Sequence, residues 1–264
     1  MKNFPRASSV RSCVAARDYS VLLLVCLIAS GGYAATVVDD FNDGNDQGWT
    51  HYDPLAAFGA AGSYTVSGGT YRLQAPPSPN QAALGPGRAG SLRLDTGFDD
   101  FFVSVDLVNW VDTADQAFGL LARIQEPGLG TTDGYGFLYV PADRDFEIER
   151  FDNEANDIIG PIIGFTLDPA RDYRMTFSGT ADMLTGEVFD LADLATPLVT
   201  VVAFDVTYST GVTGLLVADA SSGGVSSDAT FDNFFAVPEP GNLLLLLAGL
   251  CCLARRALLR PTSR

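Results

Sequence analysis

Short runs in which apolar and polar residues alternate recur through the middle of the 264-residue chain, and they constrain its fold more than any other feature. In Phe101–Leu107 the odd-numbered positions are apolar, and in Phe118–Ile124 the even-numbered positions form the apolar set. A period of two places alternate side chains on opposite faces of a β-strand, so one face of each run is predicted to be buried. No stretch of 36–236 carries an apolar stripe at helical spacing, so this region is predicted to be all-β.

Turn residues such as Asp133-Gly134 and Ser67-Gly68-Gly69 separate these runs. About a dozen short strands with this punctuation favour two packed antiparallel sheets, that is, a jelly-roll sandwich. The predicted strands cover 36–41, 63–66, 70–75, 101–107, 118–124, 135–140, 145–151, 173–179, 186–191, 197–204, 212–219 and 229–236.

Residues 1–35 have the features of a secretory signal peptide. Lys2 and three arginines precede the apolar run Val21–Ala29, and small residues follow it up to Ala35. A charged segment, a short apolar core and a small-residue cleavage zone direct export. The chain is therefore predicted to leave the cytoplasm as a body that begins near residue 36.

Residues 237–264 form a second segment of distinct composition. Pro238, Glu239 and Pro240 precede the apolar run Leu243–Ala254, and Arg255 and Arg256 follow it. This order resembles the PEP-CTERM sorting signal of bacterial surface proteins, which implies a hydrophobic transmembrane helix and processing by an exosortase. An ordinary tail anchor is the alternative. The 12-residue run would form a helix about 18 Å long, whereas the hydrocarbon core of a membrane is about 30 Å thick. A helix this short suits a temporary stop in the membrane better than a permanent anchor.

Charge and cysteine usage restrict the functions open to residues 36–236. The chain has 16 basic and 32 acidic residues, of which eight basic and two acidic residues lie in the two terminal segments, so the body is near −22. Such a body repels nucleic acid and anionic lipid. All four cysteines lie in the terminal segments, and His51 is the only histidine. Thiol catalysis and histidine-based zinc sites are thereby excluded from the body.

The body resembles the concanavalin A-like lectin/glucanase superfamily. The resemblance rests on Asp39–Asp46 followed by Trp49, on Gly69–Leu73, Phe118–Arg123 and Tyr135–Phe137, and on the closing Thr230–Phe234. It implies a jelly roll in which the first and last strands lie side by side. It does not imply an activity, because lectins, hydrolases and adhesion modules share this superfamily.

The segment Asp39–Asp46 is a candidate calcium site, since it holds four aspartates and two asparagines in eight residues. Oxygen ligands at this density suit Ca²⁺. The predicted ligands are Asp40, Asn42, Asp43 and Asp46, joined by Asp232 if the first and last strands pair. The alternative is a turn in which Asn and Asp side chains accept hydrogen bonds from their own backbone.

The string Asp145–Asp152 contains the candidate catalytic residues. On a strand, Glu147 and Glu149 point to the same face, as a pair of glycosidase carboxylates does. Laminarinase-type hydrolases of the superfamily carry Glu-x-Asp-x-x-Glu on one strand, and the matching positions are Glu147, Glu149 and Asp152. The middle and last residues are exchanged relative to that pattern, which displaces the acid. A solvated strand face is the simpler interpretation.

The candidate glycan-binding residues are Asp106, Trp110, Arg123, Tyr135 and Tyr139. Strand phase is expected to place them on the outer side of neighbouring strands, where they could line a concave groove. Aromatic faces with Asp and Arg provide the stacking surface and the bidentate hydrogen bonds that a sugar needs. The alternative is that the tyrosines belong to the core and Trp110 closes one end of the sandwich.

The sequence therefore favours a non-enzymatic, exported β-sandwich, displayed at the cell surface or in the extracellular matrix, that binds or associates with exopolysaccharide. Its expected partners are a glycan, an exosortase and, through the C-terminal helix, the membrane. Calcium is the expected cofactor if there is one. The alternatives are a glycoside hydrolase and a purely structural acidic matrix protein.

Overall fold

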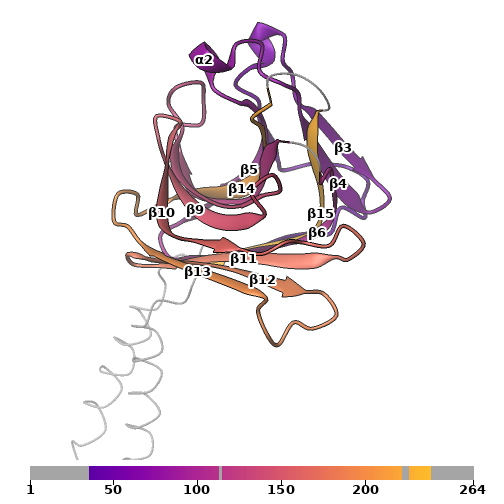
Figure 1. Ribbon diagram of the computed structural model, residues 1–264, viewed down its shortest axis with the longest axis vertical. Helices are drawn as coiled ribbons and strands as arrows, with labels where there is room; N and C mark the ends of the chain where they lie inside the picture. The colour runs from indigo at the N-terminus through magenta and orange to yellow at the C-terminus, as the bar shows by residue number, and fades with distance from the viewer. Residues whose placement is uncertain (1–35, 113–114, 222–225, 239–264) are drawn as a thin grey trace, which may run out of the picture. The chain divides into compact units, whose positions relative to one another are not determined.

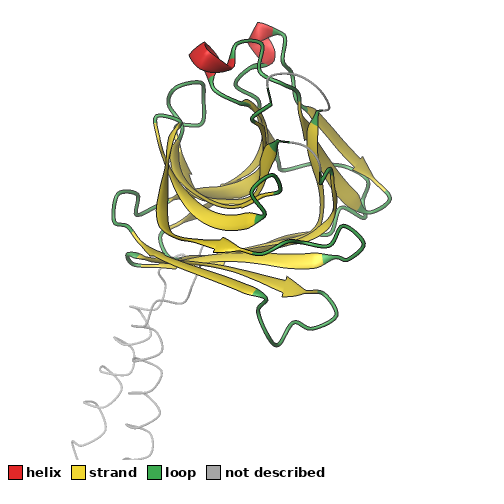
Figure 2. Ribbon diagram, viewed as in Figure 1, coloured by secondary structure: helices red, strands yellow, loops and turns green. Residues whose placement is uncertain are grey.

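The computed structural model describes residues 36–112, 115–221 and 226–238. Fifteen strands and two short helical turns, η1 (Ala56–Phe58) and α2 (Gln81–Leu84), make up this part of the chain. The strands form two antiparallel sheets that pack face to face (Figures 1 and 2). The prediction of an all-β jelly-roll sandwich is therefore confirmed.

Sheet A has eight strands, with β13-β12-β11-β6-β15-β4-β3 as its main path and β1 paired to β15. The pairing of β1 with β15, in which Val37 lies opposite Ala236, places the first and last strands side by side as expected. The strands are β1 (Val37–Asp39), β3 (Ser63–Ser67), β4 (Thr70–Ala75), β6 (Phe101–Trp110), β11 (Tyr173–Thr180), β12 (Met183–Asp190), β13 (Val199–Phe204) and β15 (Ser227–Pro238).

Sheet B has seven strands in the order β10-β9-β8-β7-β14-β5-β2. Its strands are β2 (Thr50–Tyr52), β5 (Gly87–Phe98), β7 (Gln116–Gln125), β8 (Asp133–Val140), β9 (Asp145–Asp152), β10 (Ala155–Gly164) and β14 (Gly211–Asp219). The sheet curls strongly, and its concave face lies on the side away from sheet A (Figure 1). That concave face positions the candidate site.

The main core fills the space between the two sheets. Strand β6 contributes Phe101, Val103, Val105 and Leu107 to it, all fully buried, so the predicted phase of this strand is confirmed. Aromatic rings bridge the layers, with Phe137 of sheet B packed 6.1 Å from Phe177 of sheet A between ring centroids. A core built on these rings folds without a disulfide, since residues 36–236 contain no cysteine.

Two β-bulges reverse the strand phase at predicted ligand residues. On β6 the pairing with β15 skips Val108, so Trp110 turns inward and packs near Phe118 and Tyr173. On β7 the register shifts between Ala122 and Gln125, and Arg123 turns into the sandwich and is 2% exposed. An extra residue in one strand moves every following side chain to the opposite face.

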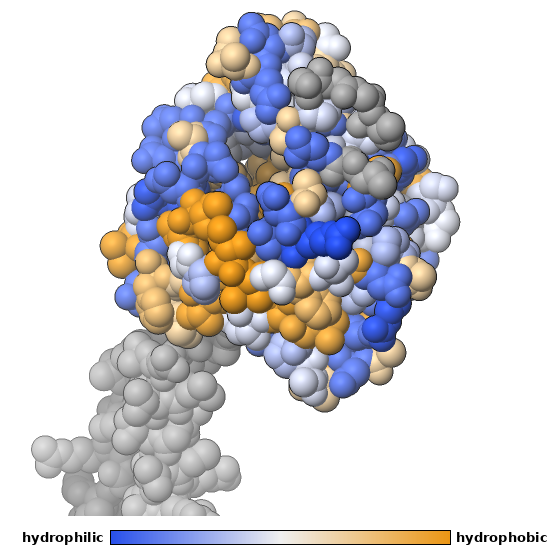
Figure 3. All heavy atoms as spheres, viewed as in Figure 1, coloured by the Kyte–Doolittle hydropathy of each residue, from blue (hydrophilic) through white to orange (hydrophobic). Residues whose placement is uncertain are grey.

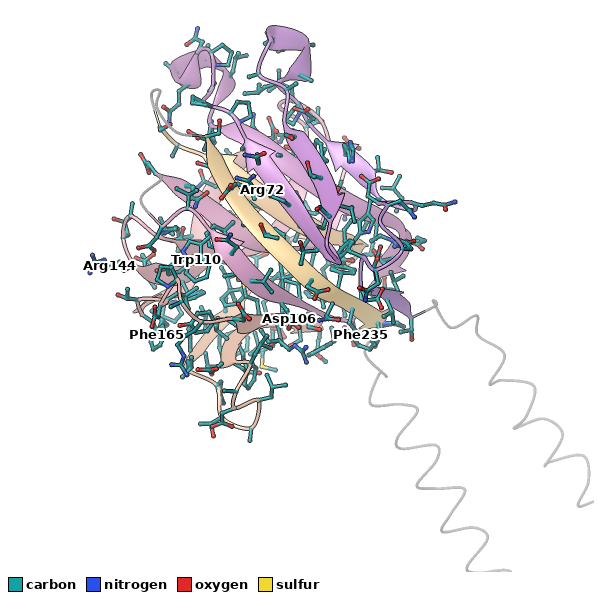
Figure 4. All side chains as sticks on the ribbon, turned by 90° about the vertical axis from the view of Figure 1, so that its right-hand side faces the viewer. Arg72, Asp106, Trp110, Arg144, Phe165 and Phe235 are labelled. Atoms are coloured by element: carbon teal, nitrogen blue, oxygen red, sulfur yellow. The ribbon has the colours of Figure 1, made fainter. Side chains whose placement is uncertain are left out.

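The predicted groove formed by Asp106, Trp110, Arg123, Tyr135 and Tyr139 is therefore wrong in its placement. Both tyrosines lie in the core on the inner face of β8, and Arg123 donates hydrogen bonds to the carbonyl oxygens of Asp99, Ala181 and Tyr208. Asp106 lies on the outer side of sheet A, where Arg174 binds it at 2.7 and 2.9 Å (Figure 4). The alternative, in which the aromatic residues are structural, is the one that the structure adopts.

One side of the sandwich is closed where the edge strands β10 and β13 meet. A Cβ atom added to Gly160 of β10 would lie 3.0 Å from the Cβ of Ala203 in β13. Exposed apolar side chains of β10 and β13, among them Ile158, Ile162 and Phe204, cover this seam, and an apolar patch lies over this part of the molecule (Figure 3). Contact between these two edge strands therefore joins the two sheets on this side of the sandwich.

The terminal segments predicted for sorting lie outside the described residues, apart from Val237 and Pro238 at the end of β15. The described ranges include no helix that is both long enough and apolar enough to cross a membrane. The predictions that concern the signal peptide, Glu239, Pro240, the apolar run and Arg255 and Arg256 therefore stay predictions.

Replacement of Gly186 by alanine tests the packing of one sheet on the other. A Cβ atom at Gly186 in sheet A would lie 2.3 Å from the Phe137 ring of sheet B. We expect Gly186→Ala to lower the free energy of unfolding by about 1–3 kcal/mol, the usual cost of overpacking a core. The matched control is Gly164→Ala, since nothing lies within 4 Å of a Cβ atom there. Equal stability of the two variants in urea denaturation would contradict the packing described here.

Candidate functional site

A second apolar cluster lies on the concave face of sheet B, separate from the main core. Its buried members are Tyr52, Leu92, Leu121, Ile124, Leu138 and Leu216. Leucines and glycines alternate between neighbouring strands here: Leu138, Gly119, Leu216 and Gly90 form one row, and Gly136, Leu121, Gly214 and Leu92 the next. These strands therefore carry apolar residues on both faces. One face packs against sheet A in the main core, and the other forms a second buried surface on the concave side.

The glycines that alternate with these leucines leave space for two aromatic rings. A Cβ atom at Gly90 would lie 2.7 Å from Tyr52, and one at Gly136 would lie 3.1 Å from the Phe151 ring. The rings of Tyr52 and Phe151 therefore rest directly on the sheet backbone at two sides of the apolar floor. Between them the concave face remains deep enough to enclose a cavity.

The cavity has a volume of about 300 Å³, at the lower limit of typical ligand pockets. Leu121, Leu138 and Leu216 form its floor, and Glu147, Glu149 and Asn156 line the side formed by β9 and β10. Arg88 and Glu154 line it as well. The molecular surface is hollowed on this side of sheet B, with apolar atoms at depth (Figure 3). The site thus combines an apolar floor with polar side walls.

Glu147 and Glu149 form a carboxyl pair on β9. Each is only 7% exposed, and both face the cavity because alternate residues of a strand share a face. Burial, reinforced by the charge of Glu149 and a hydrogen bond with its carboxyl group, raises the pKa of Glu147 to about 8. Burial also raises the pKa of Glu149, against the effect of hydrogen bonds from Asn156 and Glu147. At neutral pH the two carboxyl groups therefore share a proton.

A polar bridge ties opposite sides of sheet B together over the concave face. Glu154, in the turn after β9, accepts a hydrogen bond from the Tyr52 hydroxyl and lies 3.3 Å from Arg88. Thr132 donates to the Tyr52 oxygen at 3.0 Å, and the Gly130 backbone N–H donates to Glu154 at 2.5 Å. In a flat sheet, β9 and β2 would be about 24 Å apart, since five strand spacings of about 4.8 Å separate them. The bridge therefore fixes the curl of the sheet and closes one side of the cavity.

The three carboxylates proposed for catalysis are not all brought together. Strand β9 pairs in regular register with β8 from Asp145 to Phe151 and with β10 from Ile148 to Asp152, so Asp152 points to the face opposite Glu147 and Glu149. Asp152 is exposed, and its Oδ1 accepts a hydrogen bond from Asn153. The prediction that Asp152 completes a catalytic set is therefore wrong, because no bulge shifts the phase of this strand.

The side chains of the candidate calcium segment are occupied by local hydrogen bonds. Asp40 and Asp43 accept from the backbone N–H groups of Asn42 and Asn45, and Asp46 binds His51 at 2.7 Å. Asp232 lies near Asp106 and Asp40, whose charges add to burial in raising its pKa. Within the described ranges, no group of three or more His, Cys, Asp or Glu side chains could hold a metal ion. The arrangement is that of the capped turn.

Sequence reasoning identified Glu147 and Glu149 but not the rest of the cavity. Its floor comes from Leu121, Leu138 and Leu216, which the alternation pattern assigns to the less apolar face of their strands. Arg88 and Tyr52 lie on β5 and β2, and neither strand was predicted. One feature of the sequence does point to the floor. Segments 118–124 and 135–140 carry apolar residues on both faces, which is more than a strand with one solvated face needs.

Comparison with known proteins identifies the fold. The carbohydrate-binding module CBM66 from Bacillus subtilis is 18% identical, with a TM-score of 0.53 over 73% of this chain and 97% of that chain. A prokaryotic β-1,3-1,4-glucanase (lichenase) derived from a mouse hindgut metagenome is 13% identical, with a TM-score of 0.56 over 78% and 100%. The winged bean acidic lectin, solved with methyl-α-D-galactose, is 10% identical, with a TM-score of 0.52 over 76% and 97%.

No protein-family model matches the sequence, and no curated protein matches it. The structural likenesses confirm the jelly-roll sandwich predicted from the sequence. At these identities they are a statement about the fold alone.

The carboxyl pair predicts a pH-dependent stability. The folded-state pKa of Glu147 is about 8 against an ordinary value of 4.5, so between these values the folded chain holds a proton that the unfolded chain has lost. The free energy of unfolding should therefore fall as pH rises through this range, by about 1.4 kcal/mol per unit of pKa difference. We expect Glu147→Gln to flatten this fall, as measured by urea denaturation at several pH values.

The matched control for this experiment is Glu126→Gln, which removes an exposed carboxylate in the loop after β7. Its pH profile should follow that of the unaltered protein. Parallel profiles for Glu147→Gln and the unaltered protein would show that the pair is not protonated in the folded state.

Proposed function

We propose that this chain is an exported, non-catalytic carbohydrate-binding β-sandwich whose ligand site is the concave face of sheet B. One observation carries the proposal: an apolar floor and a buried carboxyl pair face the same cavity of about 300 Å³. Neither feature holds the sandwich together, since the main core lies on the other face of the sheet. Residues that are costly to bury and are not needed for folding are best explained by a ligand.

The chemistry of the cavity suits a sugar ring. A pyranose has an apolar face of C–H groups and a rim of hydroxyl groups, so it needs both an apolar surface and hydrogen-bond partners. Leu138 and Leu216 offer that surface, and Glu147, Glu149 and Asn156 offer acceptors and donors at one side of it. Hydrogen bonds to charged groups contribute about 1.5–3 kcal/mol each, which is enough to orient a small ligand.

The polar bridge limits the length of chain that the site accepts. Glu154 with Tyr52 and Arg88 obstructs one side of the cavity, so a glycan cannot extend in that direction without breaking these contacts. The proposed ligand is therefore a short oligosaccharide or the end of a longer chain. The names of the structural neighbours, a carbohydrate-binding module and a lectin, agree with this class of ligand.

Glycoside hydrolysis is the second candidate, favoured by the raised pKa of Glu147 in a cavity and by the glucanase among the neighbours. Retaining glycosidases hold their two carboxyl groups about 5–5.5 Å apart, with the sugar between them. Here a hydrogen bond joins the carboxyl groups of Glu147 and Glu149, which is closer than the spacing that those enzymes hold. With Asp152 on the opposite face, binding is the better supported function.

We further propose that the terminal segments deliver this module to the cell surface or the extracellular matrix, with removal of the tail by an exosortase. The basis is the order of Pro238-Glu239-Pro240, an apolar run and Arg255-Arg256 at the end of the chain. Mass spectrometry of the protein recovered from its producing cells tests this proposal. A C-terminus near residue 240 supports it, and an intact tail on a cytoplasmic chain contradicts it.

The glycan proposal is tested by screening the purified chain on an oligosaccharide array, followed by calorimetry and assays of reducing-sugar release with the saccharides that bind. We expect binding without turnover. Glu149→Ala should weaken binding roughly 10- to 100-fold, the range for loss of a hydrogen bond to a charged group. Glu187→Gln, which removes a carboxylate from sheet A, is the matched control and should bind normally.

Two other results would change the assignment. Turnover that Glu147→Gln abolishes would establish the hydrolase instead. Absence of binding to every saccharide tested would leave the acidic structural protein as the remaining alternative.

A further inference from the structure

The cavity carries an excess of negative charge. Its lining contains five acidic side chains, Asp115, Asp143, Glu147, Glu149 and Glu154, against the single cation Arg88. Arg88 already pairs with Glu154 at 3.3 Å and donates to the carbonyl oxygen of Leu84. The carboxyl groups on the β9 side of the cavity therefore have no cationic partner within the lining.

The rest of the body supplies no cation to this pair. Residues 36–236 contain no lysine and eight arginines. Seven of these arginines pair with carboxylates other than Glu147 and Glu149. The eighth, Arg144, is exposed in the turn before β9, and its side chain extends away from the body (Figure 4). A positive charge at the carboxyl pair must therefore come from outside the described chain.

The pair is also buried to an unusual degree for groups without such a partner. Glu147 and Glu149 are each 7% exposed, and among the described residues their partners are each other and Asn156. Buried carboxylates are normally paired or metal-bound, because leaving water is costly for a charge. In this cavity a shared proton takes the place of the cation.

From this charge imbalance we infer that the sugar unit bound in the cavity carries a free amino group, whose ammonium ion lies between Glu147 and Glu149. The inference rests on the proposed carbohydrate-binding function and specifies its ligand class. An ammonium group has three N–H donors, enough for both carboxyl groups and for the Asn156 side-chain oxygen. The leucine floor then receives the apolar face of the ring.

The same charges exclude other classes of sugar. Uronates, sulfated sugars and phosphorylated sugars would place a negative charge against the acidic lining at short range. An N-acetylated amino sugar is neutral, so it forms no ion pair with the carboxyl groups, and it adds bulk in a cavity of about 300 Å³. A neutral hexose fits by shape but leaves the carboxyl pair without a counter-charge.

Binding of an ammonium ion should displace the shared proton. The groups that face Glu147 are Glu149 and Asp145 on β9, Asp143 in the preceding turn, and Asp115, Arg88 and Glu154 around the cavity. Because most of these are acidic, the pair binds either a proton or the ligand cation, and the two compete. Affinity for an amino sugar should therefore rise from about pH 5 to about pH 7, while affinity for a neutral sugar should not.

Three disaccharides with one skeleton test the inference. Cellobiose, N,N′-diacetylchitobiose and fully de-N-acetylated chitobiose differ only in the group at C2: hydroxyl, acetamido or ammonium. We expect calorimetry with the full chain to show that the de-N-acetylated disaccharide binds at least about tenfold tighter than the other two. Glu147→Gln and Glu149→Gln should remove this preference, with thermal unfolding used to confirm that each variant is folded.

A non-specific attraction between an acidic protein and a cation must be distinguished from a site. The matched control Glu126→Gln removes the same charge from an exposed loop and should keep the full preference. Equal losses in Glu126→Gln and Glu147→Gln, or an amino-sugar affinity that vanishes at physiological salt, would overturn the inference.

The remaining outcomes separate this inference from the proposed function. If neutral saccharides bind in the cavity as tightly as amino sugars, the inference fails and the proposed function stands. If no amino saccharide binds while other saccharides do, the inference also fails. If no saccharide of any class binds, the proposed function itself fails.

Discussion

The contact of Glu154 with Tyr52 and Arg88 is the interaction on which the shape of the candidate site depends. It joins the turn after β9 to strands on the far side of sheet B, so the sheet is held in a tight curl rather than an open twist. The curl turns one face of the sheet into a cavity and lowers the exposure of the groups within it. The raised pKa of Glu147 and the burial of the leucine floor both depend on that enclosure.

The two sheets differ in how their outer faces are paired. Sheet A packs its inner face on the core, and on its outer face Arg174 with Asp106 and Arg72 with Asp228 form ion pairs near the surface (Figure 4). Such pairs contribute little to binding a ligand, because their charges are already satisfied. Sheet B packs apolar residues on both faces, and Glu147 and Glu149 on its concave side have no arginine partner within the part of the chain that the structure describes. This asymmetry is the physical reason for placing the ligand on sheet B.

Strand periodicity predicted the fold class and the core of β6 correctly, because the spacing of Phe101, Val103, Val105 and Leu107 follows regular pleating. It misplaced Trp110 and Arg123, because a bulge inserts one residue without any mark in the apolar pattern. Glu147 and Glu149 were identified as a pair from their spacing on β9, where the register is regular. Their cavity could not be predicted, since it arises from contacts between residues about 100 positions apart, such as Tyr52 and Glu154.

We expect ligand to bind on the concave face of sheet B and not on the outer face of sheet A. The most direct measurement is an NMR titration of the isotopically labelled chain with an oligosaccharide that binds it. Binding in the cavity should shift the methyl signals of Leu121, Leu138 and Leu216 and the signal of the Asn156 side-chain amide, and it should leave the signals of Val38 and Val202 on sheet A unchanged. Shifts confined to sheet A, with the leucine methyl signals unmoved, would contradict it.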